Sequence, residues 1–454
     1  MVTQLHVAVL PWLSQGWNQS LLHINPTKHP KTPQIKVPSF LAWLIHLVEF
    51  PLPTLDNDLL PEGAEATVDV PFEKIQYLKV AYNLLRHPFK RFILEQLPDW
   101  ILIDMIPYWA AEIAAEHQIS TIYFSVYSGA TYVFFGHPQS LVGDGQKRIR
   151  PSPESLTSPP EWVDFPSLLA YRSFEAIGAY EGVYGGNASG TKDAERIFKI
   201  LQSSQAVAIR SCPEHEGEYL NLFEKIINRP VIPTGLLPPE KPEGRIRHTA
   251  EEPWSVIFDW LDRQKPKSVV FVGFRSECKL SKETVHEIAY GLELSGLPFL
   301  WALRKPNWAV DDLDALPLGF SDRTHGRGVV QIGKILSHSF IGGSLFHSGR
   351  GSVIETLQFG HCLVVLPLIH DQPLNARVLV EKGLAVEIER SEDGSFTREG
   401  IAKALKLAMV SEEGESLRIR AKEATMVFGD QKLHDGYFDR FVEYLKKGAR
   451  DGGE

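Results

Sequence analysis

The sequence predicts an α/β fold built from two doubly wound domains. Patterns typical of short buried strands alternate with helical patterns along both halves of the chain, as in parallel sheets covered by helices. A proline-rich segment, residues 234–244, separates the two halves and is typical of a domain linker. The 454 residues allow two or three domains, and a hydrophobic content of 43% is sufficient for their cores.

The first half begins with a strand pattern and then becomes irregular. Residues 5–10 (LHVAVL) form a short apolar run that predicts a buried first strand. A helix and a second strand should follow in a doubly wound domain. Instead, residues 25–39 carry Pro26, Pro30, Pro33 and Pro38, a spacing that no helix interior tolerates. We expect this segment to be irregular.

Regular alternation returns after residue 70. Helical patterns cover residues 72–96, 109–117 and 194–203, and strand patterns cover residues 100–104, 120–124 and 206–210. Residues 143–166, rich in proline and serine, are expected to form a surface excursion.

The second half repeats this alternation. Ser281 is expected to cap a helix that buries Val285, Ile288, Ala289 and Leu292 and ends at Gly296. Other helices are expected at residues 254–262, 353–359, 398–409, 415–426 and 437–447, and strands at 268–274, 299–303, 329–332, 342–346 and 362–366.

Composition excludes several classes of protein. A net charge of −9 argues against a nucleic-acid partner, which requires a basic face. Three widely spaced cysteines, Cys212, Cys278 and Cys362, indicate reduced thiols, and no cluster of cysteine and histidine suggests a metal site. The apolar run at residues 40–50 is too short to span a membrane. We therefore expect a soluble, cytoplasmic protein without a metal.

The most informative stretch runs from Gly342 to Gln372. A short apolar strand leads through a small-residue loop, His347 to Ser352, into a helix. Such a turn directs backbone N–H groups and the helix dipole at an anion, and the side chains of His347 and Ser352 add donors. Glu355 follows one turn later, where a carboxylate accepts hydrogen bonds from ribose hydroxyls.

A second strand, residues 362–366, ends in a loop that carries Asp371 and Gln372. These two side chains offer an acceptor and an amide to a polyol. Sites for phosphate, ribose and sugar hydroxyls, in that order, predict a nucleotide sugar as ligand.

This stretch resembles the C-terminal part of the signature box of plant family 1 UDP-glycosyltransferases, whose pattern is HSGWNS followed by Glu, Pro and Asp-Gln. The resemblance extends over most of the chain and is strongest for the branch that elongates flavonoid and terpenoid glycosides, including UDP-rhamnose:rhamnosyltransferases. It implies a GT-B fold, two Rossmann-like domains facing across a cleft. Against this family the N-terminal domain is too short, by its first helix and second strand.

The resemblance also implies domain limits and donor-site residues. The acceptor domain would cover residues 1–235, a linker 236–245, the UDP-sugar domain 246–430, and a helix in 431–454 would return to the first domain. His347, Gly349 and Ser352 would hold the diphosphate, Glu355 the ribose, and Asp371 and Gln372 the sugar. Ser276 matches a further donor-contacting serine. The family uses no metal or cofactor, with the UDP-sugar as co-substrate and a phenolic or terpenoid molecule as acceptor.

The catalytic residues match the family only in part. In that family a histidine after the first strand removes the acceptor proton, and an aspartate after a later strand orients it. Asp104 stands where the aspartate is expected, but Trp17 occupies the position of the histidine. An indole nitrogen only donates, so Trp17 cannot act as the base. His23 and His29 lie nearby and are interpreted as loop histidines.

Further departures fall on the donor site. The tryptophan that stacks on uracil is missing from residues 329–334, Arg350 replaces the tryptophan of HSGWNS, and Arg275 stands where a glycine is expected. Loss of one base–aromatic stack costs about 1–3 kcal/mol.

Two hypotheses follow. The first is an inverting UDP-glycosyltransferase that transfers glucose or rhamnose to a plant secondary metabolite, with weak or lost activity. The second is a non-catalytic pseudoenzyme that binds a nucleotide sugar, a phenolic ligand or a paralogue. A nicotinamide-dependent enzyme is disfavoured because no GxGxxG follows a strand, and a serine hydrolase because no GxSxG does.

Overall fold

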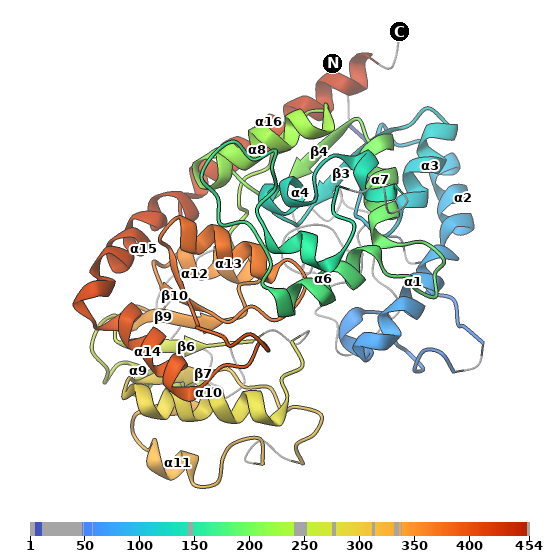
Figure 1. Ribbon diagram of the computed structural model, residues 1–454. Helices are drawn as coiled ribbons and strands as arrows, with labels where there is room; N and C mark the ends of the chain where they lie inside the picture. Colours follow the sequence, from blue (N-terminus) through green and yellow to red (C-terminus); the bar gives the residue numbers. More distant parts are fainter. Residues whose placement is uncertain are drawn as a thin grey trace. The chain divides into compact units, whose positions relative to one another are not determined.

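The computed structural model describes residues 5–10, 48, 50–56, 58–143, 149–239, 252–274, 278–310, 314–330, 336 and 338–451. The chain forms two compact units (Figure 1). The first comprises Met1–Ser155, Tyr180–Leu237 and Lys432–Glu454, and the second comprises Leu156–Ala179 and Pro238–Gln431. Residues 156–179 pack with the second unit, although the predicted acceptor domain, residues 1–235, included them.

The first unit contains a parallel sheet with the strand order β1-β2-β3-β4-β5. Its strands are β1 (Val7–Leu10), β2 (Trp100–Ile103), β3 (Ser120–Ser125), β4 (Ala206–Ile209) and β5 (Val231–Pro233). Within the described part of the chain, β1 pairs only with β2. The sequence predicts that a helix and a second strand are missing after β1. That prediction concerns residues 11–47, which lie outside the described residues.

The α-helices of the first unit connect these strands and cover them. They are α1 (Ile75–Asn83), α2 (Arg86–Gln96), α3 (Tyr108–Glu116), α4 (Gly129–Phe135), α5 (Pro138–Val142), α7 (Asp193–Ser203), α8 (Pro213–Ile227) and α16 (Gln431–Asp451). Single helical turns lie at Thr67–Asp69 and Phe72–Lys74. The predicted helix over residues 72–96 is therefore interrupted at Leu84 and Leu85, between α1 and α2.

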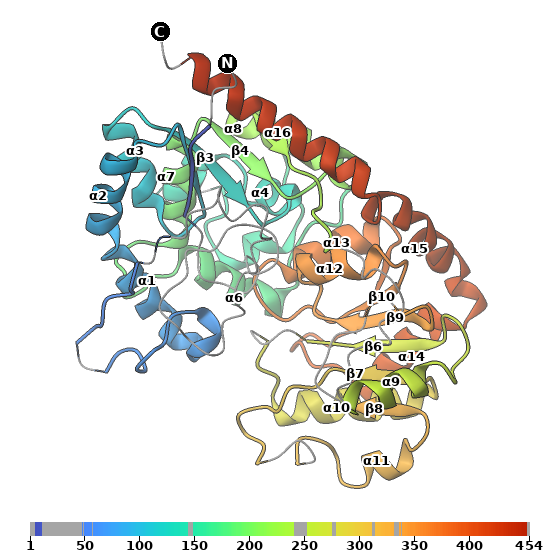
Figure 2. The ribbon, with the colours of Figure 1, turned by 180° about the vertical axis from the view of Figure 1, so that it is seen from behind.

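Helix α16 covers one face of the first sheet. Phe441 and Leu445 of α16 pack among Trp100 and Leu102 of β2, together with buried residues of β3 and β4. Side chains two apart on a strand share a face, which explains why Trp100 and Leu102 meet the same helix. Figure 2 shows the long α16 running beside α8.

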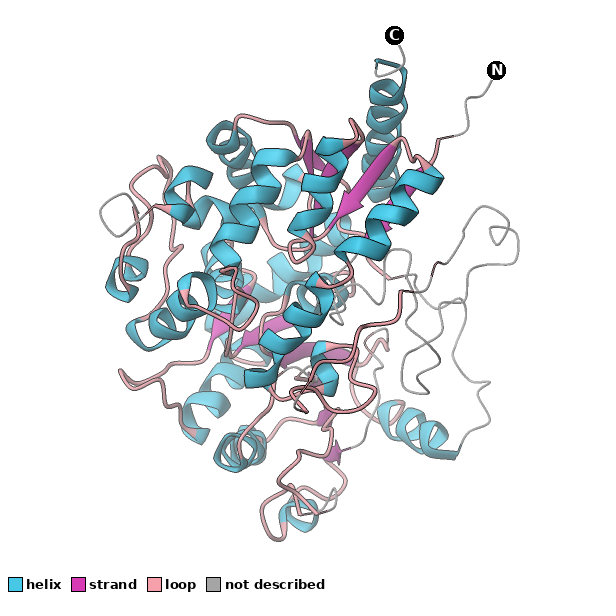
Figure 3. Cartoon of the chain, turned by 90° about the vertical axis from the view of Figure 1, so that its right-hand side faces the viewer, coloured by secondary structure: helices cyan, strands magenta, loops and turns pink. Residues whose placement is uncertain are grey.

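The second unit contains a parallel sheet with the order β11-β10-β9-β6-β7-β8. Its strands are β6 (Val269–Val272), β7 (Phe299–Trp301), β8 (Gly328–Val330), β9 (Ile341–Phe346), β10 (Cys362–Val365) and β11 (Ala385–Glu387). Numbered within this unit, the order is 3-2-1-4-5-6, that of a doubly wound dinucleotide-binding fold. Both sheets (magenta in Figure 3) lie among helices (cyan), which confirms the predicted α/β class.

Helices cover both faces of the second sheet. They are α9 (Glu252–Leu261), α10 (Lys282–Ser295), α11 (Phe320–Arg323), α12 (Arg350–Leu357), α13 (Gln372–Glu381), α14 (Arg398–Met409) and α15 (Glu415–Phe428), with one turn at Glu412–Gly414. Val269 and Phe271 of β6 face α9, whereas Val270 and Val272 face α10 and α14. Ser281 caps α10 as predicted, and Gly296 ends it.

Two further elements join the units in sequence: Pro153–Thr157, a short helical segment, and α6 (Ser173–Tyr184). The predicted surface excursion at residues 143–166 is wrong in one respect, because Leu156 is fully buried.

Candidate functional site

The topology of the second sheet marks one place as a binding site. Strand order reverses between β6 and β9, which lie side by side. In open parallel sheets, ligands bind outside the carboxyl ends of the strands at this switch point. The loop that leaves β9 there carries His347 and Gly349, and α12, which follows it directly, carries Ser352, which was expected to lie in the loop.

The turn from β9 into α12 has a constrained backbone. All six residues of β9 are buried, so the strand is held firmly up to Phe346. Ser348 has a φ of 59°, in the left-handed region that non-glycine residues rarely adopt. Its hydroxyl donates to the carbonyl oxygen of Gln372 at 2.8 Å, which ties this turn to the next loop of the predicted site.

His347 and Gly349 fit closely together at this turn. His347 is 2% exposed, and the centre of its ring lies 6.2 Å from that of Phe274, two residues after β6 ends. A Cβ atom on Gly349 would lie 2.6 Å from Nε2 of His347, closer than real atoms approach. Residue 349 must therefore be glycine if the imidazole is to keep this position.

Helix α12 carries the next two predicted residues. Gly349 caps the helix without a side chain, so the first N–H groups of α12 receive no side-chain cap from it. Ser352 and Glu355 are three residues apart, which places them on neighbouring turns of one face, and they are 9% and 3% exposed. Glu355 lies about one turn beyond the N-terminus of α12, so a ligand with its phosphate at that N-terminus could place hydroxyl groups near this buried carboxylate.

The loop after β10 brings Asp371 and Gln372 to the same sheet edge. Oε1 of Gln372 accepts hydrogen bonds from the N–H groups of Leu368 and Ile369, both at 3.0 Å. Gln372 was predicted to lie in a loop, but it opens α13. Its amide oxygen holds the turn, while its Nε2 lies 3.7 Å from Sγ of Cys278.

Asp371 has an unusual environment for a carboxylate. Burial raises its pKa, while a hydrogen bond from Asn375 and the nearby charges of His370 and Arg350 act in the opposite direction. Nδ2 of Asn375 donates to Asp371 at 2.9 Å and to the carbonyl oxygen of Ser348 at 3.3 Å. Sequence reasoning missed Asn375, although its spacing of four residues from Asp371 on a helix was a signal for this contact.

Asp104 lies in the first unit, at the carboxyl end of β2. It is 5% exposed, and its N–H donates to the carbonyl oxygen of Leu10 at 3.2 Å. Asp104 therefore stands beside the end of β1, after which the predicted base position follows in sequence. Burial and the Asp104 charge both raise the pKa of Tyr82 and of Tyr123. Trp17, His23 and His29 lie outside the described residues, as does Ser276.

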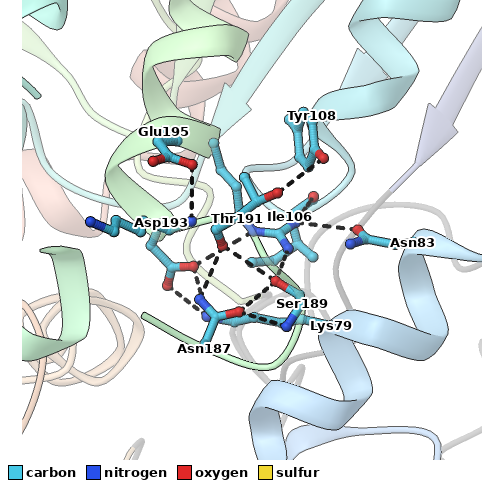
Figure 4. A network of polar contacts seen from close by, with 11 residues as sticks. Lys79, Asn83, Ile106, Tyr108, Asn187, Ser189, Thr191, Asp193 and Glu195 are labelled. Carbon is cyan, nitrogen blue, oxygen red and sulfur yellow. Dashed lines mark hydrogen bonds and ion pairs between the residues drawn. The ribbon is translucent and has the colours of Figure 1, made fainter. Parts of the chain in front are cut away.

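A buried arginine fixes the loop that follows Asp104 (Figure 4). Arg196 of α7 is fully buried and donates to the carbonyl oxygen of Ile106 and to the hydroxyl of Ser189, both at 2.7 Å. Asp193 neighbours this guanidinium and also pairs with Lys79 of α1 at 2.7 Å. The network joins α1, α7 and the loop after β2. No pattern in the sequence predicted it.

No group of three or more metal-binding side chains occurs among the residues that the structure describes. In the same ranges no helix is both long and apolar enough to cross a bilayer. The three cysteines are all described, and they are buried and not joined by disulfides.

Comparison with known proteins shows which family of proteins this chain resembles. A model of the family "UDP-glucoronosyl and UDP-glucosyl transferase" matches residues 232–419. The chain is 38% identical over 466 residues to UDP-glycosyltransferase 91A1 of Arabidopsis thaliana, which covers 98% of this chain and 97% of that protein. It is 40% identical over 472 residues to soyasaponin III rhamnosyltransferase of Glycine max, with coverage of 98% and 96%.

Among solved structures, Phytolacca americana UGT2 complexed with UDP-2fluoro-glucose and pterostilbene has a similar fold. The TM-score is 0.67 at 22% sequence identity, over 97% of this chain and 91% of that one. Together with the two parallel sheets, this similarity confirms the GT-B fold class. With relatives of this identity along nearly its whole length, the chain belongs to the UDP-glycosyltransferases of plants, enzymes that transfer a sugar from a UDP-sugar.

Proposed function

We propose that this protein transfers a sugar, glucose or rhamnose, from its UDP-sugar to a hydroxyl of a plant secondary metabolite such as a flavonoid or terpenoid glycoside. One observation carries the proposal. The anion-binding turn of His347 to Ser352 and the polar turn of Asp371 and Gln372 leave neighbouring parallel strands at the same sheet edge. The 40% identity to a protein named soyasaponin III rhamnosyltransferase supports a rhamnose donor.

The residues take the following roles in this proposal. His347, Ser352 and the backbone at Gly349 bind the diphosphate and stabilise its charge as it leaves. Glu355 accepts from the ribose hydroxyls, and Asp371 and Gln372 bind the sugar, the latter through Nε2 because Oε1 holds the turn. Ser276 contacts the donor. No metal or cofactor takes part.

Transfer is inverting. The acceptor hydroxyl loses its proton and attacks the anomeric carbon from the face opposite the diphosphate, which leaves with the bonding electrons. Asp104 takes the role of the carboxylate that orients the base, and its position beside the end of β1 supports this role. Since Trp17 occupies the base position, we propose that turnover is weak or absent.

Trp17 also favours the second candidate, a pseudoenzyme that binds the nucleotide sugar, a phenolic ligand or a paralogue without turnover. Both candidates are assigned to the cytoplasm, which the buried cysteines without disulfides support.

The deciding experiment measures UDP release from the purified protein. UDP-glucose and UDP-rhamnose are offered with flavonoid and terpenoid glycosides, alongside calorimetric titration with UDP. We expect UDP to bind and acceptor-dependent release to be slow, and Trp17→His to raise the rate at least about a hundredfold, the usual contribution of a general base. Binding without release in both proteins supports the pseudoenzyme. Absence of UDP binding contradicts the transferase and the pseudoenzyme that binds a nucleotide sugar.

A further inference from the structure

Residues 156–179, which we call the strap, pack within the second unit although the chain on either side belongs to the first. The strap is anchored by buried side chains: Leu156 and Leu169 are fully buried, and Tyr171 is 3% exposed. The N–H of Tyr171 donates to the carbonyl oxygen of Leu156 at 3.0 Å, which closes the strap into a loop.

An ion network that is buried except at Arg172 fixes the C-terminal part of the strap. Arg172 pairs with Glu387 of β11 at 3.1 Å, and Glu175 pairs with Arg377 of α13 at 2.9 Å. Arg377 also pairs with Glu387, so two strap residues, one residue of α13 and one of β11 form a connected group of ion pairs. Because Glu175 and Glu387 side chains are 3% and 8% exposed, breaking either pair would leave a buried charge uncompensated.

Tyr171 connects the strap to the polar turn of the proposed donor site, where Asp371 and Gln372 lie. Its hydroxyl donates to the carbonyl oxygen of His370 at 3.0 Å. His370 immediately precedes Asp371 and has a φ of 56°, a left-handed conformation that surrounding contacts must maintain. The bond from Tyr171 acts on that strained residue.

Other residues hold the rest of this turn through hydrogen bonds. Nη1 of Arg390 donates to the carbonyl oxygen of Pro367 at 2.7 Å, and the guanidinium lies 4.6 Å from the ring centre of Phe174 in the strap. The side-chain oxygen of Gln372 accepts hydrogen bonds from the N–H groups of Leu368 and Ile369. The backbone carbonyl oxygen of Gln372 accepts one from the hydroxyl of Ser348. The strap thus contacts both the turn itself and the arginine that holds its start.

We propose that Tyr171 is a positioning residue for sugar recognition, which sets the backbone at His370 so that Asp371 and Gln372 face the sugar of the donor. This inference rests on the proposed function, because it assumes that Asp371 and Gln372 bind the sugar. The strap comes from the part of the chain that precedes the linker, so donor recognition depends on a residue far outside the signature stretch.

The test compares Tyr171→Phe with the unmodified protein by calorimetric titration with UDP, UDP-glucose and UDP-rhamnose. The ring stays and only the hydroxyl is lost, so the fold is retained. We expect the dissociation constant for UDP to stay within twofold, because the diphosphate and ribose contacts are elsewhere. The dissociation constant for whichever UDP-sugar binds more tightly should rise about five- to tenfold, the effect of one lost hydrogen bond.

Tyr180→Phe is the matched control. The hydroxyl of Tyr180 also donates to a backbone carbonyl oxygen, that of Pro151 at 2.6 Å, but in the first unit. This variant should leave all three dissociation constants unchanged. Hydrogen exchange gives a second measurement without ligand: amides of residues 368–372 should exchange faster in Tyr171→Phe and not in Tyr180→Phe.

Asp371→Asn separates the inference from the function beneath it. If Asp371→Asn weakens UDP-sugar binding selectively while Tyr171→Phe changes neither the UDP-sugar dissociation constant nor the hydrogen exchange, the inference is wrong and the proposed function stands. Equal weakening of UDP and UDP-sugar by Tyr171→Phe also overturns it, since the hydroxyl would then act on the whole site. If Asp371→Asn has no selective effect, the proposed sugar site is itself wrong and the inference falls with it.

Discussion

The imidazole of His347 occupies the space that a side chain at residue 349 would need. Because a Cβ atom at residue 349 would lie 2.6 Å from Nε2 of His347, Gly349→Ala must displace a buried ring. Displacement of one donor to the diphosphate should weaken UDP binding about tenfold, as expected for a lost charged hydrogen bond. Calorimetric titration with UDP measures this.

Gly436→Ala is the control for that substitution. Gly436 lies in α16, and a Cβ atom there has no neighbour within 4 Å. The added methyl group should leave UDP affinity unchanged and stabilise the helix by about 0.5–1 kcal/mol. Equal UDP affinity in Gly349→Ala and the unmodified protein would contradict the proposed role of this turn.

His361 makes stability depend on pH. Burial lowers its pKa to about 3, and its Nδ1 lies 2.9 Å from the hydroxyl of Ser344. Between pH 6.5 and 3 the unfolded chain binds a proton at this residue and the folded protein does not, so stability falls as pH decreases. From pH 7 to pH 5 the loss from His361 should be about 2 kcal/mol.

Urea denaturation at both pH values measures this contribution. The difference in unfolding free energy between pH 7 and pH 5 should be smaller by about 2 kcal/mol in His361→Gln than in the unmodified protein. His325→Gln, at an exposed position, should leave the difference unchanged. The same pH difference in His361→Gln and in the unmodified protein would refute the assignment.

At the scale of elements, α16 and the first sheet depend on each other. Phe441 is 2% exposed against Trp100 and its neighbours, and Nε1 of Trp100 donates to the carbonyl oxygen of Leu445 at 2.9 Å. Phe441→Ala leaves a cavity in this layer, so the free energy of unfolding should fall by about 3–5 kcal/mol. Urea denaturation followed by circular dichroism measures it.

Met426→Ala provides the comparison. Met426 lies in α15 and is 69% exposed, so its loss should change the unfolding free energy by less than about 0.5 kcal/mol. A loss of similar size in both variants would show that α16 does not stabilise the sheet through Phe441.

Most elements could be predicted because their signal is local. Runs such as VVFV in β6 and CLVV in β10 are buried along their whole length, as their composition indicates. Helix α8 was not anticipated, and its backbone departs from helical angles at Glu216. Glu216 is fully buried and accepts from Ser211 at 2.5 Å, a tertiary arrangement without a counterpart in helical periodicity.

In the candidate site, too, residues within a local motif could be predicted and residues that act through tertiary contacts could not. His347, Ser352 and Glu355 were found because one short motif carries them, with the chemistry in the side chains themselves. Tyr171 was missed because its contribution is a bond to a backbone carbonyl 199 residues away, and backbone acceptors leave no trace in a sequence. The roles given to His347, Ser352 and Glu355, like those given to Asp104 and Ser276, remain predictions.

At the scale of the whole molecule, the chain passes from one unit to the other four times, near residues 155, 179, 237 and 431. The domain limits predicted from the proline-rich linker missed the first two of these crossings. The strap itself does not have the composition of a linker. Each unit is therefore assembled from pieces that are distant in the sequence.

This interleaving sets an order for biosynthesis. The ribosome makes the strands of the first sheet early, but Phe441 and Leu445, which cover one face of it, emerge only after the whole second sheet. While synthesis continues, that apolar face waits without its own helix, and it is the part of the nascent protein that a chaperone would shield. The unit that starts first is the last to be completed.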